Sequence, residues 1–258
     1  MSIDLDLQDG GIAVITINRP EKRNALDAEH YEALSKAWTR VRDDEAIRVA
    51  VVTGAGDQVF SAGADLKSWI GRKVDPAEIW QTQKGMLLNR GLEIWKPVVA
   101  AINGHCLAGG MTLMLATDIR VAASHATFAL SEVRRGIIAA NGGTQRLPRQ
   151  LPHAIAMELL LIGDAIDAET AARWGLVNRV VPAVEVMETA LGLARRIAAN
   201  APLAVQAAKE LALRGPGMGL AEGLRLEQFM QQQLQRSEDA AEGRAAFAEK
   251  RQPRFNGR

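Results

Sequence analysis

The sequence has little of what several protein classes require. It contains one cysteine, Cys106, among 258 residues, which excludes a disulfide framework or a cysteine-based metal cluster and favours a reducing, intracellular compartment. No uninterrupted apolar run approaches the roughly 18 residues of a membrane span. The acidic first residues, MSIDLD, do not resemble a signal peptide. We therefore expect a soluble, cytoplasmic protein without a membrane partner.

Net charge and aromatic content are also low. The chain has 31 Lys and Arg against 30 Asp and Glu, a formal charge of +1, and 4% aromatic residues. General nucleic-acid binding needs a broad positive field, so nucleic acid is not an expected partner. Any phosphate group must be held by a local patch. No His or carboxylate spacing suggests a metal site.

Short β-branched runs alternate with helical patterns along the first half of the chain. Strands are expected at residues 11–18, 49–53, 98–102 and 119–122. Asp27 is a candidate cap for a helix that follows the first strand. This alternation predicts βαβ units and a largely parallel sheet, which is an α/β fold.

The last hundred or so residues have a mainly helical pattern. We therefore expect a core domain at residues 1–195 and a helical region at residues 196–258, packed on the core or on a neighbouring subunit. The sequence shows no linker or fixed-period repeat between them.

Two glycine-rich turns join predicted strands to predicted helices, at Ser61–Asp65 and Gly104–Gly110. Small residues let a ligand approach the backbone, and a helix N-terminus presents unpaired N–H groups. Two such groups that converge would bind a carbonyl oxygen and, more strongly, the oxyanion formed from it. Tight helix–sheet packing would explain either turn alone, but the pair favours a functional site.

Three common nucleotide and hydrolase signatures are absent from the sequence. Neither turn is a Walker A motif or a Gly-x-Gly-x-x-Gly motif, and there is no Gly-x-Ser-x-Gly elbow. The sequence therefore lacks the motifs that usually indicate nucleotide hydrolysis, dinucleotide redox chemistry or α/β-hydrolase chemistry.

One carboxylate, Glu132, lies in an apolar run at residues 128–133. Apolar surroundings disfavour the charged form and raise the pKa of a carboxyl group toward the range useful for proton transfer. The sequence leaves a second interpretation open, in which Glu132 forms an ion pair with Arg134, Arg135 or Arg146.

Ordered motifs from about residue 10 to residue 255 closely resemble the enoyl-CoA hydratase/isomerase family, also called the crotonase superfamily. The motifs are Asn18-Arg19-Pro20, Asn24-Ala25-Leu26, Ser61-Ala62-Gly63-Ala64-Asp65-Leu66, Asn103-Gly104, Ala108-Gly109-Gly110, Asp118, Ser131-Glu132, Gly142-Gly143-Thr144-Gln145-Arg146-Leu147, Gly175-Leu176-Val177, Glu242-Gly243, Ala246-Phe247 and Glu249-Lys250-Arg251.

The resemblance implies a crotonase-like spiral of ββα units with a helical C-terminal trimerisation region, and trimers often paired into hexamers. It implies an acyl-CoA thioester substrate, with coenzyme A as part of the substrate rather than a separate cofactor. It also implies that the N–H groups of Ala64 and Gly109 form an oxyanion hole for an enolate and that Glu132 is the proton-transfer acid/base.

The resemblance further implies a coenzyme A site. In its own subunit the contacts would come from Lys22, Arg23, Ala25, Leu26, Ala62, Asp65 and Leu66, and in an adjacent subunit from Phe247 and Lys250. Trp69 and Trp80 lie where family members often bind the acyl group, although packing on the core would explain them equally well. Asp65 also fits a helix cap.

The sequence departs from family hydratases at one position. These enzymes carry two glutamates, and Thr112 stands where the first is expected, while Glu132 matches the second. Hydration needs one group to activate water at Cβ and another to protonate Cα, and a threonine hydroxyl is a poor base. Family isomerases use the later glutamate alone.

The resemblance thus implies an enzyme of the enoyl-CoA hydratase/isomerase type, a lyase or isomerase. It leaves isomerisation and atypical hydration or dehydration open. The alternative is a catalytically weakened family member that binds acyl-CoA or RNA, and the near-neutral charge argues against RNA.

Overall fold

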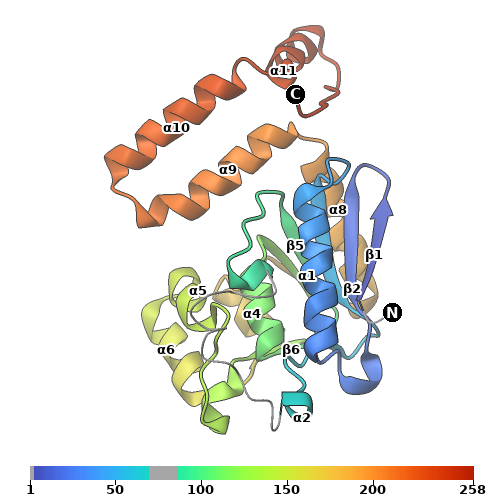
Figure 1. The fold of residues 1–258 in the computed structure, drawn as a ribbon, viewed down its shortest axis with the longest axis vertical. Helices are drawn as coiled ribbons and strands as arrows, with labels where there is room; N and C mark the ends of the chain where they lie inside the picture. The colour runs from blue at the N-terminus through green and yellow to red at the C-terminus, as the bar shows by residue number, and fades with distance from the viewer. Residues whose placement is uncertain (1–2, 70–86) are drawn as a thin grey trace.

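The computed structural model describes residues 3–69 and 87–258, and its centre is a six-stranded sheet (Figure 1). The strands run in the order β1-β2-β3-β5-β7-β10, with β1 antiparallel to β2 and the other neighbours parallel. Their bounds are β1 Ile3–Gln8, β2 Ile12–Ile17, β3 Val49–Gly54, β5 Val98–Ile102, β7 Ile119–Ala123 and β10 Arg179–Val181.

The central strands β3 and β5 are buried along their whole length. Parallel strands that are covered on both faces read as continuous apolar runs, and these two do. Val51 of β3 pairs with Val14 of β2 and with Val99 of β5, so β-branched side chains stack across the sheet. The four strands predicted from the sequence are all present.

A second, four-stranded sheet lies beside the first in the order β4-β6-β8-β9. Each of three successive passes of the chain adds one strand to the large sheet and the next strand to the small sheet: β3 then β4, β5 then β6, β7 then β8. A helix or helical turn follows each pair, which gives the predicted spiral of ββα units. The bounds are β4 Val59–Ser61, β6 His105–Leu107, β8 Thr127–Ala129 and β9 Ile166–Asp167.

Helices cover both faces of the large sheet. In Figure 1, α1 lies in front of the sheet and α8 behind it, and α8 packs against β3, β5 and β7. Asp27 caps α1 by accepting a hydrogen bond from the His30 N–H at 3.1 Å, as predicted. The α-helices of the body are α1 Ala28–Asp43, α2 Leu66–Trp69, α4 Gly109–Leu115, α5 Gly143–Gln150, α6 His153–Ile162, α7 Ala168–Arg173 and α8 Val186–Ala198.

Single helical turns link these elements. They are η1 Pro20–Lys22, η2 Leu88–Arg90, η3 Ser131–Arg135, η4 Ala183–Glu185 and η5 Gly215–Gly217. Across residues 3–69 and 87–258, no helix is long and apolar enough to cross a membrane.

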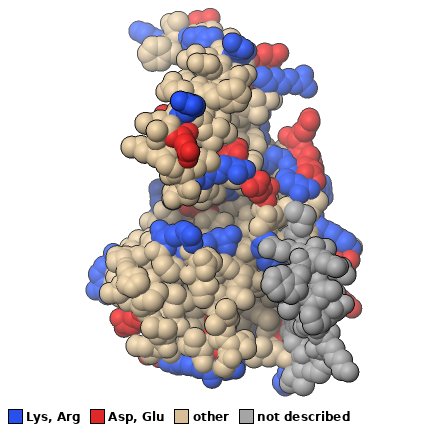
Figure 2. Space-filling view, turned by 60° about the vertical axis from the view of Figure 1, so that its left-hand side comes forward, with Lys and Arg blue, Asp and Glu red and all other residues tan. Residues whose placement is uncertain are grey.

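Three C-terminal helices extend away from the body, at the top of Figure 1. They are α9 Pro202–Arg214, α10 Leu220–Leu234 and α11 Glu238–Glu249. α9 and α10 contact each other and contain no buried residue. Figure 2 shows a hollow between this region and the body, with Lys and Arg side chains gathered along its lower edge. The predicted domain boundary at residue 195 falls inside α8, which is buried as far as Ala198.

The structure contains strands that the sequence patterns did not predict. β1 alternates acidic and apolar residues at the start of the chain, whereas β6, β8 and β9 are only two or three residues long. β10 interrupts a region that was expected to be helical, because it pairs with β7 and forms the edge of the large sheet. Strands this short have too little sequence pattern to be predicted.

Candidate active site

The two glycine-rich turns meet at the start of α4. A Cβ atom placed on Gly63 would lie 2.5 Å from the Gly109 nitrogen, and one placed on Gly109 would lie 3.1 Å from the Gly63 Cα. A side chain at Gly63 would therefore force the two backbones apart, and one at Gly109 would be tightly crowded; Gly63 also has a φ of +85°. Among the described residues, neither the Ala64 N–H nor the Gly109 N–H has a hydrogen-bond acceptor. Two free amide donors therefore lie side by side.

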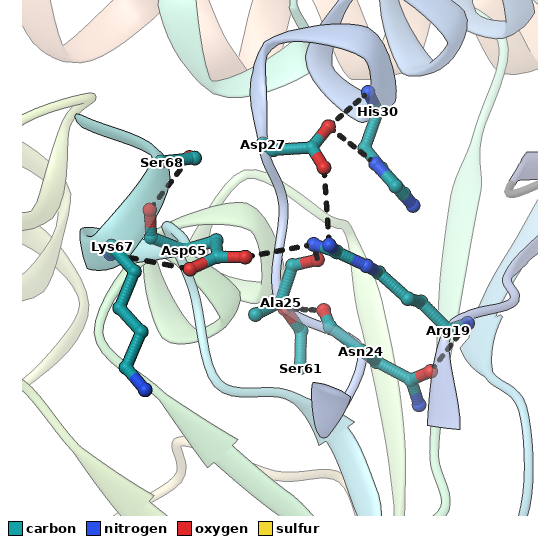
Figure 3. A network of polar contacts seen from close by, with 9 residues as sticks. All are labelled: Arg19, Asn24, Ala25, Asp27, His30, Ser61, Asp65, Lys67 and Ser68. Atoms are coloured by element: carbon teal, nitrogen blue, oxygen red, sulfur yellow. Dashed lines mark hydrogen bonds and ion pairs between the residues drawn. The ribbon is translucent and has the colours of Figure 1, made fainter. Parts of the chain in front are cut away.

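A network of polar contacts fixes the Ala64 turn to the loop that precedes α1 (Figure 3). The Arg19 guanidinium contacts the carboxylates of Asp65 at 3.1 Å and Asp27 at 3.2 Å. Ser61 accepts a hydrogen bond from the Gly63 N–H at 3.1 Å and donates one to the main-chain oxygen of Asn24 at 2.8 Å. The position of the Ala64 amide is therefore set by side chains far away in sequence.

Asn24 is fully buried and has a left-handed φ of 52°. Its side-chain amide donates to the main-chain oxygens of Ala55 and Val59, and its side-chain oxygen accepts from the Arg19 N–H. Three hydrogen bonds hold the loop in a conformation that asparagine tolerates better than most residues.

The residues predicted to contact coenzyme A in the same subunit lie on these two loops. The Leu26 N–H donates to the Gly63 oxygen at 2.8 Å, and the Ala62 N–H donates to the Arg23 oxygen at 3.0 Å, so the loops run together. Ala25 and Leu26 are buried, Ala62 is half-buried, and Lys22, Arg23 and Leu66 are exposed. Two of the exposed residues, Lys22 and Arg23, are cations.

Asp65 is occupied by protein contacts. Besides pairing with Arg19, its carboxylate accepts a hydrogen bond from the Lys67 N–H at 3.2 Å at the start of α2. This is the helix-cap role that the sequence left open. Trp69 ends α2, and Trp80 lies outside the described residues.

Phe247 and Lys250 lie at the far end of the molecule from these loops. They belong to α11 and its C-cap, and the Phe247 side chain is 87% exposed. In Figure 1, α11 is at the top, whereas α2 and the loop before α1 are at the bottom. The structure therefore does not bring these two residues to the coenzyme A loops of their own chain.

Glu132 is positioned by the small sheet. The Ala108 N–H donates to the Ala129 oxygen at 2.8 Å, which joins the strand before α4 to the strand before η3. Glu132 lies three residues beyond Ala129, in η3, so its helical turn adjoins the turn that carries Gly109.

The Glu132 carboxylate is buried and its Oε2 atom has no hydrogen-bond partner among the described residues. Burial raises the pKa of this carboxyl group, while the hydrogen bond from its own main chain and the Arg135 charge lower it in part.

The ion-pair interpretation of Glu132 is wrong, because the three candidate arginines have other partners. Arg134 pairs with Asp164, Arg135 bonds to Ser131, and Arg146 bonds to the main-chain oxygens of Asn89 and Asn141.

Thr112 is buried one turn into α4, and its hydroxyl group is engaged by the protein. The hydroxyl donates to the Gly109 oxygen at 3.0 Å and accepts from the side-chain amide of Asn89 at 3.1 Å. Thr112 therefore has no proton free for a ligand in this arrangement. Asn89 could not be predicted as part of the site, because nothing in its local sequence pattern indicates a contact 23 residues away.

A spiral of ββα units with two free amides beside a buried carboxylate defines an enzyme of the crotonase class. A sequence profile described as enoyl-CoA hydratase/isomerase matches residues 8–258, and the chain belongs to this family.

Several named relatives are similar over nearly the whole chain. An (E)-benzylidenesuccinyl-CoA hydratase of Thauera aromatica is 42% identical over 249 residues, covering 95% of this chain and 96% of that protein. A carnitinyl-CoA dehydratase of Proteus mirabilis is 41% identical over 253 residues, covering 96% of each. The crystal structure of an enoyl-CoA hydratase from Bacillus anthracis has a TM-score of 0.92 at 36% identity and covers 100% of both chains.

Gly63→Ala is expected to disrupt the paired amides. The new methyl group overlaps the Gly109 nitrogen and forces one N–H group out of place, and the loss of one such donor lowers kcat by about 10²–10³-fold. Gly175→Ala is the matched control, because Gly175 has a φ of +78° and no atom within 4 Å of the added carbon. The test is kcat for turnover of an enoyl-CoA thioester, with urea unfolding of both variants. Equal losses of kcat in both would contradict the assignment.

Glu132→Gln is expected to stabilise the fold at pH 8 and to have little effect near pH 4. The raised pKa of the carboxyl group means that stability falls as pH rises from the ordinary value of about 4.3 through the folded-state value. The neutral amide of Gln does not titrate, so the variant does not lose this stability as the pH rises. The free energy of unfolding is measured with urea at both pH values, with the exposed Glu158→Gln as control. A loss of stability at pH 8 would show that the carboxylate has a partner.

Proposed function

We propose that this chain catalyses the reversible hydration of an enoyl-CoA thioester. The observation that carries the proposal is the pair of free amides of Ala64 and Gly109 together with the buried carboxylate of Glu132, whose Oε2 atom has no hydrogen-bond partner among the described residues. The relatives named as a hydratase and a dehydratase favour water addition and removal over other reactions of the family.

The amides act on the thioester carbonyl. Both N–H groups donate to its oxygen and stabilise the negative charge that grows there as an enolate forms. Because the donors are fixed by the two loops, they need no rearrangement when the charge develops. This contribution lowers the barrier for any reaction that passes through the enolate.

Glu132 moves the proton. As a carboxylate it accepts one proton from water while the oxygen bonds to Cβ, and the double-bond electron pair passes to the enolate. The carboxylic acid then returns the proton to Cα, where it forms a new C–H bond as the carbonyl re-forms. The raised pKa of Glu132 suits both steps, because it makes the carboxylate a better proton acceptor than an ordinary glutamate while the acid can still return the proton.

Isomerisation is a second candidate, and Thr112 is the observation that favours it. A single carboxylate is sufficient to take a proton from Cγ of a 3-enoyl-CoA and return it to Cα, and the Thr112 hydroxyl, already bonded to Gly109 and Asn89, supplies no second base. Both candidates use the same oxyanion and the same glutamate.

Coenzyme A fits the loops that carry Lys22 and Arg23, whose exposed cations suit its phosphates. Phe247 and Lys250 then serve the site of an adjacent subunit, because α11 lies at the other end of their own chain (Figure 1). The exposed apolar side chains of α10, Leu220, Leu224 and Phe229, provide the contact surface. The matching assembly is a homotrimer or a hexamer of paired trimers.

Crotonyl-CoA and a 3-enoyl-CoA distinguish the two reactions. Hydration removes the absorbance of the conjugated enoyl thioester, and isomerisation creates it. Glu132→Gln is expected to lower kcat by at least about 10²-fold in either case while the Kd for acyl-CoA changes little. The acid limb of the kcat/KM profile is expected above pH 4.3, roughly the ordinary glutamate value.

Undiminished turnover by Glu132→Gln, alongside unchanged turnover by the control Glu158→Gln, would overturn the mechanism. Tight acyl-CoA binding with no turnover of either substrate by the unaltered protein would instead support a binding protein.

Phe229→Glu on α10 is expected to shift the assembly toward smaller species, because it places a charge on the apolar contact surface. Sedimentation velocity of the unaltered chain is expected to give three or six times the 27.9 kDa subunit mass. Gln231→Glu, which adds a charge at an exposed α10 position, is the control. A monomeric unaltered chain would contradict the proposed assembly.

A further inference from the structure

A hydrogen-bonded cluster continues from Thr112 away from the oxyanion turns. Asn89 bonds to Thr112, and the next residue, Arg90, donates from Nε to the side-chain oxygen of Asn141 at 2.6 Å. Arg146 donates from Nη1 to the main-chain oxygens of Asn89 at 3.1 Å and Asn141 at 3.3 Å. The guanidinium groups of Arg90 and Arg146 are thereby held close to Thr112, through Asn89 and Asn141.

Neither guanidinium has an acidic partner within residues 3–69 and 87–258. Both side chains are half-buried, and neither appears in an ion pair there; the Nη groups of Arg90 donate no hydrogen bond in the same part of the chain. Burial, together with the nearby charge of Arg149, lowers the pKa of Arg146. Positive charge removed from water is unfavourable unless an opposite charge accompanies it. The cluster is therefore one that an anionic ligand group would stabilise.

Tyr31 contacts Arg90 and lies within electrostatic range of Glu132. The Arg90 guanidinium lies over the Tyr31 ring, 5.6 Å from its centroid. Burial raises the pKa of the Tyr31 hydroxyl, the Arg90 charge lowers it and the Glu132 charge raises it. The hydroxyl is thus within electrostatic reach of both groups. Arg90 and Glu132 therefore both lie near Tyr31, close enough for one acyl group to span them.

We infer that the acyl group of the substrate carries a carboxylate beyond its reacting carbons and that Arg90 binds it. The Nε of Arg90 is held by Asn141, which leaves the two Nη groups to form a bidentate contact with both carboxylate oxygens. This inference rests on the proposed function, because the thioester must first bind at Ala64 and Gly109.

The phosphates of coenzyme A are another source of negative charge. In the proposed function, however, they bind the exposed cations Lys22 and Arg23, on the loop that runs beside the Ala64 turn. Arg90 instead joins the site through Asn89 and Thr112, one helical turn beyond Gly109 along α4. In this proposal Lys22 and Arg23 bind the coenzyme A phosphates, whereas Arg90 binds the carboxylate at the other end of the substrate.

Binding of unreactive saturated thioesters tests the inference without relying on turnover. Isothermal titration calorimetry compares glutaryl-, adipoyl- and pimeloyl-CoA with the monocarboxylic acyl-CoAs of equal length, and with free coenzyme A. For at least one length, the intact protein is expected to bind the dicarboxylic thioester about 10- to 100-fold more tightly than its partner, the effect of one strong charge-assisted contact.

Arg90→Met is expected to abolish that preference and to leave the Kd of free coenzyme A unchanged, while Arg90→Lys retains part of the preference. Arg149→Met, at an exposed position on α5, is the matched control and keeps the full preference. Far-ultraviolet circular dichroism checks that each variant is folded.

Equal binding of the two thioester series by the intact protein would overturn the inference and leave the proposed function standing. Equal loss of the preference in Arg90→Met and Arg149→Met, or weaker binding of free coenzyme A by Arg90→Met alone, would also overturn it. Failure of the intact protein to bind any thioester would overturn both proposals.

Discussion

The site depends on the close approach of two backbone segments that are 46 residues apart, at Gly63 and Gly109. A single added carbon at Gly63 would lie 2.5 Å from the Gly109 nitrogen, so the two free amides can lie side by side only because position 63 has no side chain. The rest of the fold maintains that approach. The small sheet aligns the strands that lead into the turns, and the Arg19, Asp27 and Asp65 contacts hold the first turn against the loop before α1.

The Glu132 carboxylate forms no ion pair with the arginines near it in sequence. Each arginine near Glu132 in sequence is engaged elsewhere, and Arg120, the most deeply buried arginine among the described residues, is surrounded by main-chain oxygens at Met114, Leu115, Thr117 and Leu176. Glu132 keeps an unpartnered oxygen and a raised pKa as a result. A buried carboxylate oxygen without a hydrogen-bond partner costs folding free energy, and such groups cluster at functional sites.

The two proposals together give a direction for a thioester substrate. In this proposed arrangement coenzyme A lies at Lys22 and Arg23, the reacting carbons lie between the amides and Glu132, and the far end of the acyl group lies at Arg90. The C-terminal helices project away from this body and expose apolar side chains that their own chain does not cover. The proposals thus place catalysis, recognition of the acyl group and assembly on different segments of the chain.

The central strands, the cap of α1, the two glycine-rich turns and the family could be predicted from the sequence, because β-branched runs, a capping aspartate and ordered motifs are local signals. The folded chain was needed to show that Glu132 forms no ion pair with its neighbouring arginines, that Asp65 is held by Arg19, and that Asn89, next to Arg90, contacts Thr112. These facts depend on side chains tens of residues apart, and local periodicity contains no information about which of several possible charged partners the folded chain brings within bonding distance.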